Sequence, residues 1–397
     1  MLPKAELHLH LDGSLLPSFL FPRAERNGSC AASSPTPFPS TSSDLRVMVD
    51  LMKAEMRKGG GGGHVGLPPG ANWPMFDLMN SFLQTAADLT AASQATALHL
   101  FDVHNVKYLE VRFCPKLHTL NGLTERQATE AVCSGLSLAL SSRPGTKGGT
   151  ILCALRSLPG SHALDTATLA SAMKGEGVVG FDVAGSEQYP LSLPSVQAAL
   201  DYCKSNKMPV TVHAGELPSG TVPNLEAALA PTSPVARIGH GAALALGDSL
   251  LAPSGTSRSS EALLRRAREK GVVVEVCLTA ICTKGKGLER ISDHPVRKMV
   301  AAGVKVALSS DNLLLSGDPA TTVGGVDEEG TGIDRGFSYS NPSGEVALLV
   351  SELGFSWSEV KDIVVEGFWA GFGEKGDEWL REIEREVCEV LEKAGVL

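Results

Sequence analysis

The segment Ala5–Leu11 reads AELHLHL and is the first of eight short apolar runs in this 397-residue chain. The runs are rich in Val, Leu and Ile, and longer segments of helical periodicity separate them, which is typical of a parallel sheet covered by helices. Eight runs fit a closed barrel better than a doubly wound sheet, which usually has fewer strands. The other predicted strands are Val106–Phe113, Ile151–Leu158, Val178–Ala184, Pro209–Ala214, Arg237–His240, Val272–Leu278 and Lys305–Ser310.

Two of the intervening segments, Met75–His99 and Asp377–Ala394, carry apolar residues close to the 3.6-residue period of a helix. We therefore expect an α/β protein made of a single (β/α)8 TIM barrel over residues 1–397, with extra helices after the first strand and a C-terminal helix. Segments near 27–43, 57–70 and 316–342 are rich in Gly, Ser or Pro. Such compositions bury too little apolar surface to offset the entropy of ordering, so they predict flexible insertions.

Composition narrows the classes of partner. The net charge is −9 and no long basic run occurs, which argues against nucleic acid as a partner but is compatible with an uncharged nucleoside. No apolar stretch approaches the length of a membrane span, and the first predicted strand begins too close to Met1 for a signal peptide. The eight cysteines include no CxxC pair, which favours reduced thiols and a cytoplasmic location.

Histidines and an aspartate lie at the ends of several predicted strands. His8 and His10 are two residues apart in the first strand, so both project from the same side of the pleat. An HxH pair alone is as often two satisfied core histidines as a metal site. Here, however, His213, His240 and Asp311 end the fifth, sixth and eighth strands. The C-terminal ends of barrel strands converge on one mouth, so the five residues predict one site, and metal binding suits them.

Four sequence blocks resemble the signature blocks of the adenosine deaminase family, in its order and at its approximate spacing. They are residues 3–14 (PKAELHLHLDGS), 212–216 (VHAGE), 237–241 (RIGHG) and 309–312 (SSDN), with further similarity over 108–113, 180–187, 275–279 and 294–298. The resemblance covers nearly the whole chain apart from the three insertions. It implies zinc-dependent hydrolytic deamination of adenosine and 2′-deoxyadenosine to inosine and ammonia, as in purine salvage.

The resemblance also implies roles for individual residues. Glu216 would give a proton to N1 of the purine, for which burial should raise its pKa, and His240 would orient the attacking water. One zinc ion would be held by His8, His10, His213 and Asp311. The substrate would be contacted by His10, Asp12, Gly185 and Asn312.

Two of these contacts bear on which substrate is used. Asp12 corresponds to the contact with the ribose 5′-hydroxyl, and a carboxylate there repels a phosphate, which favours the nucleoside over a 5′-nucleotide. Many family members have a second aspartate where this chain has Asn312. An asparagine amide can donate to purine N7 without first being protonated.

Other functions are compatible with parts of this pattern. A related deaminase could act on adenine or on N6-methyl-AMP with the same metal site. A two-metal amidohydrolase would commonly have a bridging lysine at the end of the fourth strand, where Val178–Gly185 has none. A non-catalytic barrel would be expected to lose Glu216 and His240 first, and both are present. These residues favour the deaminase.

Overall fold

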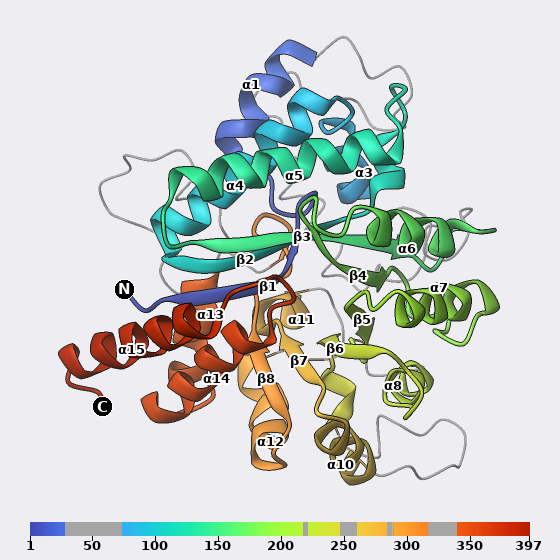
Figure 1. Cartoon of the computed structure of the whole chain (residues 1–397). Helices are drawn as coiled ribbons and strands as arrows, with labels where there is room; N and C mark the ends of the chain where they lie inside the picture. The colour runs from blue at the N-terminus through green and yellow to red at the C-terminus, as the bar shows by residue number, and fades with distance from the viewer. Residues whose placement is uncertain (28–73, 217–220, 247–259, 284–287, 289, 317–339) are drawn as a thin grey trace.

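The computed structural model describes residues 1–27, 74–216, 221–246, 260–283, 288, 290–316 and 340–397. Eight parallel strands follow one another around a single sheet in chain order, with helices on its outer face, as the apolar runs predict (Figure 1). This is the expected TIM barrel. The strands are β1 (Lys4–His10), β2 (Val106–Phe113), β3 (Lys147–Leu155), β4 (Val178–Ala184), β5 (Val210–Ala214), β6 (Val235–His240), β7 (Val273–Val276) and β8 (Lys305–Leu308).

The sheet closes between its first and last strands just beyond the end of β8. Asp311 donates its backbone N–H to the carbonyl of His8 at 2.8 Å, and its own carbonyl accepts the N–H of His10 at 2.8 Å. A parallel bridge between Leu9 and Asp311 results. The closure therefore places the carboxylate of Asp311 beside the two histidines of β1.

The helices surround the sheet, and α14 packs against β1 and β8, where the barrel closes (Figure 1). The α-helices are α1 (Pro17–Asn27), α3 (Pro74–Ser81), α4 (Ala86–His104), α5 (Glu125–Ser142), α6 (His162–Ala172), α7 (Pro194–Ser205), α8 (Val222–Ala228), α10 (Ser260–Lys270), α11 (Leu278–Thr283), α12 (Val296–Ala301), α13 (Pro342–Ser351), α14 (Trp357–Ala370) and α15 (Asp377–Lys393). Short 3-10 helices are η1 (Pro115–His118), η2 (Ala242–Leu244) and η3 (Ile291–Asp293).

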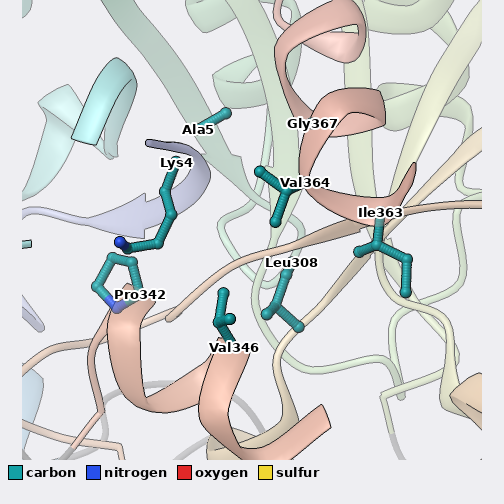
Figure 2. A pocket seen from close by; sticks show the side chains of 8 residues that line it. All are labelled: Lys4, Ala5, Leu308, Pro342, Val346, Ile363, Val364 and Gly367. Carbon is teal, nitrogen blue, oxygen red and sulfur yellow. The ribbon is translucent and has the colours of Figure 1, made fainter. Parts of the chain in front are cut away.

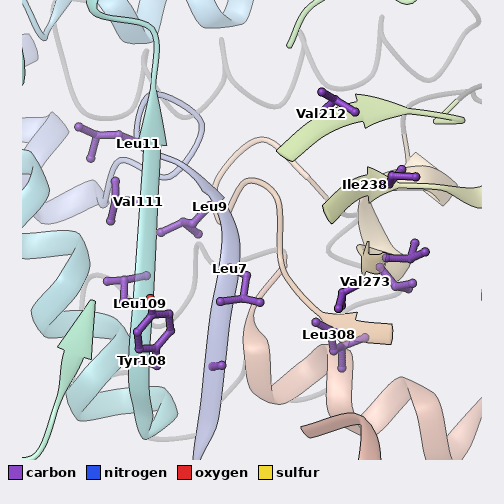
Figure 3. Packing of buried hydrophobic residues seen from close by; sticks show 14 of the residues in the cluster. Leu7, Leu9, Leu11, Tyr108, Leu109, Val111, Val212, Ile238, Val273 and Leu308 are labelled. Carbon is purple, nitrogen blue, oxygen red and sulfur yellow. The ribbon is translucent and has the colours of Figure 1, made fainter. Parts of the chain in front are cut away.

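The alternation of β1 separates its two faces. Leu7, Leu9 and Leu11 are fully buried and lie in the hydrophobic core, next to residues such as Val111 of β2 (Figure 3). His8 lies on the opposite side of the pleat, because successive side chains point to opposite faces. Burying each leucine contributes about 1.5–3 kcal/mol, and a slip of one residue would exchange the two faces. The core therefore fixes the register that turns the histidines to the interior.

The predicted boundaries of β3 and of the first helical segment were wrong. β3 begins at Lys147 rather than Ile151, because Gly148 and Gly149 pair with β2 despite their low strand propensity. A Cβ atom at Gly148 would lie 2.1 Å from the carbonyl oxygen of Leu109, so the close approach requires glycine. The predicted helix Met75–His99 is two helices, because Thr85 caps α4 by accepting a hydrogen bond from the N–H of Asp88.

The other predictions for the helices and insertions have separate outcomes. The C-terminal helix is confirmed, and α15 ends at Lys393, one residue before the predicted end. The three predicted insertions lie outside the described residues, apart from a few residues at their ends. Among the described helices, none is both long enough and apolar enough to span a bilayer.

Candidate active site

Four imidazole rings meet at one end of the barrel. The ring centroid of His8 lies 5.3 Å from that of His10, 4.6 Å from that of His213 and 4.8 Å from that of His240. The Nε2 atoms of His10 and His213 are 3.1 Å apart. The rings come from the ends of β1, β5 and β6, so parallel strands distant in sequence bring them together.

Asp311 completes this group. Its Oδ1 atom lies 3.6 Å from Nε2 of His8 and 3.6 Å from Nε2 of His10. Both Asp311 (φ 65°) and His240 (φ 67°) adopt the left-handed backbone conformation, which is costly for residues other than glycine. Such strain persists where surrounding structure enforces it, and it is concentrated at functional sites.

The separations between these atoms suit a four-coordinate metal ion. Zinc–nitrogen and zinc–oxygen bonds of about 2.0–2.1 Å give tetrahedral edges of roughly 3.3–3.5 Å between ligand atoms. The three separations, from 3.1 to 3.6 Å, bracket that edge length. His8, His10 and Asp311 form one group of potential ligands within 4.8 Å of one another, and His8, His213 and His240 form another.

The state of the His8 ring also fits metal binding. Its Nδ1 atom lies 2.7 Å from the Glu275 carboxylate, which can only accept a hydrogen bond when ionised, so Nδ1 carries the proton. Nε2 of His8 is buried and makes no hydrogen bond within the described structure. Burial also lowers the pKa of His8 and of His10 well below the usual range. Both rings are therefore neutral at pH 7, the form that binds metals.

His213 has a similar carboxylate partner. Its Nδ1 atom lies 3.2 Å from Oδ1 of Asp182, which is fully buried in β4. Arg112 in β2 links the two supporting carboxylates, because it donates to Asp182 at 3.2 Å and to Glu275 at 2.9 Å. Carboxylates that bind the outer nitrogen of a ligand imidazole fix its orientation and raise its basicity.

Glu216 and His240 lie together beside this group of potential metal ligands. Oε1 of Glu216 is 3.5 Å from Nε2 of His240. Glu216, on the turn after β5, keeps 15% of its side-chain surface exposed, whereas His240 is almost completely buried. Glu216 and His240 also form a group of possible metal ligands with Asp311. The two predicted proton-handling residues therefore face the same site.

The predicted substrate contacts Asp12, Gly185 and Asn312 follow β1, β4 and β8, at the same end of the barrel as the imidazoles. Asp12 follows β1, and burial raises the pKa of its carboxyl to about 6, so most of it is ionised at pH 7. Gly185 follows β4 with φ 89°, a conformation that favours glycine. Asn312 donates from Nδ2 to the hydroxyl of Ser316 at 3.3 Å, and a Cβ atom at Gly13 would overlap its side chain.

The residues that hold the imidazoles in place were not predicted from the sequence. Arg112, Asp182 and Glu275 are charged residues within apolar strands, and burying a charge is costly unless it is paired. That cost is a signal that could have identified them. Arg156 lies just after β3, which ends at Leu155 rather than at the predicted Leu158. Glu187 lies after β4, where charged residues are common, so its local sequence carries no comparable signal.

A small pocket lies away from this site. It lies between β1, β8, α13 and α14, and its lining includes Ala5, Val346 and Val364 (Figure 2). Of the eight residues that line it, Lys4 alone has an ionisable side chain. None of the predicted site residues contributes to it. It therefore represents a gap in packing between the barrel and its helices rather than a reaction centre.

Known proteins share both the sequence pattern and the fold. The adenosine deaminase family model matches residues 73–337. The adenosine deaminase of Enterococcus faecalis is 30% identical over 324 residues, covering 79% of this chain and 82% of the relative. Two solved structures share the fold: the Arabidopsis N6-mAMP deaminase (24% identity, 98% of each chain, TM-score 0.71) and a zinc-bound amidohydrolase from Burkholderia ambifaria (20% identity, 99% and 93% coverage, TM-score 0.70). This chain belongs to the adenosine deaminase family.

Proposed function

We propose that this chain is a zinc-dependent hydrolase that converts adenosine to inosine, and 2′-deoxyadenosine to 2′-deoxyinosine, with release of ammonia. One observation carries the proposal: the pair Glu216–His240 lies beside a cluster of imidazoles and a carboxylate with the spacing of a zinc site. A proton donor next to a metal-binding group is the combination that hydrolytic deamination requires. Family membership supports the same reaction class.

The metal-binding set in this proposal is His8, His10, His213 and Asp311. A zinc ion bound there would act as a Lewis acid that makes water a better nucleophile. The supporting carboxylates, Glu275 for His8 and Asp182 for His213, hold the rings in place before metal arrives. A fold neighbour from Burkholderia ambifaria holds zinc, which is compatible with this choice of metal.

The remaining residues act on protons and on the base. Glu216, as a carboxylic acid, donates a proton to purine N1, which makes C6 electrophilic. His240 accepts a hydrogen bond from the water that attacks C6, so it orients that water. Because Glu216 and His240 are 3.5 Å apart, both can face one reacting amidine group. Asn312 donates its amide to purine N7, and the backbone N–H of Gly185 binds the purine edge.

Asp12 selects the nucleoside in this proposal. Its carboxylate is 6% exposed, and its Oδ1 atom makes no hydrogen bond within the described structure, so it can accept one from the ribose 5′-hydroxyl. A 5′-phosphate in the same place would meet a buried like charge. One protein with this fold is an N6-mAMP deaminase, so N6-methyl-AMP must be included among the substrates tested.

The direct test compares adenosine, 2′-deoxyadenosine, adenine and N6-methyl-AMP in an ultraviolet absorbance assay, with and without a zinc chelator. We expect turnover of the two nucleosides, its loss in chelator and its return when zinc is added back. Turnover of adenine or N6-methyl-AMP alone would reassign the substrate. A chain inactive on all four, with zinc bound, would point to another amidohydrolase reaction.

A further inference from the structure

The turn after β5 carries both a proposed zinc ligand and the proposed proton donor. His213 lies in the strand, and Glu216 follows it after two residues. Gly215 has φ 76°, and a Cβ atom added there would lie 3.0 Å from Leu225. The chain can make this turn because residue 215 is glycine, and the turn presents successive backbone N–H groups toward one place.

The carboxylate of Glu187 accepts these backbone N–H groups. Its Oε2 atom accepts the N–H of Gly215 at 2.9 Å, and its Oε1 atom accepts the N–H of Glu216 at 2.7 Å. Each carboxylate oxygen therefore holds one peptide group of the turn. Glu187 is only 5% exposed, so these charge-assisted hydrogen bonds are shielded from water.

Asn224 fixes the carboxylate in turn. Its Nδ2 atom donates to the backbone carbonyl of Glu187 at 3.1 Å and to Oε2 of the same residue at 3.1 Å. Its own Oδ1 atom accepts the N–H of Leu191 at 2.8 Å. Asn224 is 1% exposed. The rotamer of Glu187 is therefore set by packing and hydrogen bonds before any substrate binds.

Arg156 binds backbone carbonyl groups near the same end of β5. One of its terminal nitrogens, Nη2, donates to the carbonyl of His213 at 2.5 Å and to that of Val183 at 3.2 Å. Arg156 is 3% exposed, and its charge is attracted by Glu187. A buried cation and a buried anion thus bind opposite ends of the four residues from His213 to Glu216.

From this geometry we infer that Glu187 is a positioning residue for proton transfer, which it serves by holding the backbone of Glu216 so that the Glu216 carboxyl faces the bound purine. The inference rests on the proposed deamination. Among the described residues, Glu187 makes no hydrogen bond or ion pair with a side chain of the proposed metal ligands or substrate contacts, so its loss should lower kcat and leave KM and zinc content nearly unchanged. Loss of folded protein alone would instead lower the apparent kcat, the zinc content and the folded fraction in parallel and leave KM unchanged.

Glu187→Gln is the primary test, because the amide keeps the size of the side chain. Only one of its two terminal atoms can accept, so one of the N–H groups of Gly215 and Glu216 faces an N–H donor instead. We expect kcat to fall by about 10–100-fold, as for other residues that orient a catalytic group through hydrogen bonds. KM should stay within about twofold, since uniform binding is not altered.

Glu345→Gln provides a matched control. Glu345 is also a buried glutamate that accepts two successive backbone N–H groups, those of Leu278 at 2.7 Å and Thr279 at 3.1 Å. These groups follow β7, and no proposed metal ligand, proton donor or substrate contact lies at the end of that strand. Glu345→Gln should lower the melting temperature as Glu187→Gln does, yet keep the wild-type kcat per folded molecule.

A second readout does not depend on turnover. Hydrogen–deuterium exchange, followed by mass spectrometry of peptides that cover residues 213–216, should be faster in Glu187→Gln than in wild type or Glu345→Gln. Asn224→Ala is the milder variant to use if Glu187→Gln does not fold. It retains the carboxylate but releases its orientation, so we expect a smaller fall in kcat and a smaller rise in exchange.

The outcomes separate the inference from the proposed function. If wild type deaminates none of the four purines, the proposed function fails and the positioning role fails with it. If wild type is active and Glu187→Gln matches its kcat, the inference alone fails. It also fails if kcat, zinc content and folded fraction fall in parallel, or if exchange over residues 213–216 is unchanged.

Discussion

The Nδ1 atom of His8 lies 2.7 Å from Oε2 of Glu275, and both side chains are completely buried. Glu275 is also bound by Arg112 at 2.9 Å and, through Oε1, by Arg237 at 2.6 Å and the hydroxyl of Thr211 at 2.9 Å. The pKa of Glu275 is lowered, because these two cations outweigh the cost of burial. An ionised carboxylate therefore fixes which nitrogen of His8 faces the proposed metal site.

Glu275→Gln should weaken zinc binding by about 10–100-fold, because the neutral amide no longer orients the His8 ring or raises its basicity. It should also reduce the free energy of unfolding by about 3–5 kcal/mol, since two buried guanidinium groups lose a counter-charge. A competition titration against a chromophoric chelator measures the first effect, and chemical denaturation the second. Glu110→Gln is the control: Glu110 pairs with Arg237 but contacts no imidazole of the site. Equal zinc affinity in Glu275→Gln and wild type would contradict the proposed support.

Glu216→Gln should reduce kcat for adenosine by about 10²–10⁴-fold and leave the zinc content unchanged. The substitution preserves side-chain size and removes the proton that N1 requires. Metal analysis and the absorbance assay on the same preparation make the comparison. Because Glu216 lies within ligand distance of His240 and Asp311, loss of zinc from this variant would identify Glu216 as a ligand instead.

Asp12→Asn should change the ratio of kcat/KM for N6-methyl-AMP to that for adenosine in favour of the nucleotide. The change removes a buried negative charge that opposes the phosphate and weakens the acceptor for the 5′-hydroxyl. A lost hydrogen bond of about 1–2 kcal/mol corresponds to a fall of roughly 5–30-fold in kcat/KM for adenosine. If the ratio of kcat/KM for the two substrates does not change, Asp12 does not determine which substrate the enzyme prefers.

Acid should destabilise the fold through buried histidines such as His118. Burial lowers the pKa of His118 to about 4, although its Nδ1 donates to the carbonyl of Leu83 at 2.9 Å. The unfolded chain takes up this proton below about pH 6.5, whereas the folded chain resists it until about pH 4, so the stabilisation is complete above pH 6.5 and is lost as the pH falls. Between pH 7 and pH 5 this one residue should remove about 2 kcal/mol.

His118→Asn tests that sign. Asparagine can keep the donor to Leu83 but does not titrate, so the variant should be less stable at pH 7 and lose less stability on going to pH 5. Chemical denaturation at the two pH values gives both quantities. An identical loss in wild type and variant would show that His118 does not contribute to the acid sensitivity.

The barrel was predictable because its signal is local. The apolar run of β1 shows the two-residue alternation of a strand, and the histidines at strand ends indicate which face of the sheet points to the interior. Closure between β1 and β8 follows from the strand order. The start of β3 was missed because Gly148 enters the sheet for reasons of space, which propensity does not register. Glu187 and Gly215 are 28 residues apart in the sequence, and they form a hydrogen bond because β4 and β5 are neighbours that end on the same side of the barrel. The amino-acid sequence alone therefore does not reveal this contact.

The proposed zinc site is best tested by the zinc content of the purified chain, determined by elemental mass spectrometry on wild type, His10→Ala and His213→Ala. We expect one zinc ion per wild-type chain and little in either variant, with both variants still folded, because removing one of four ligands opens the site. Wild-type protein that binds no zinc when supplied with it, or variants that retain it fully, would show that these residues do not form a zinc site.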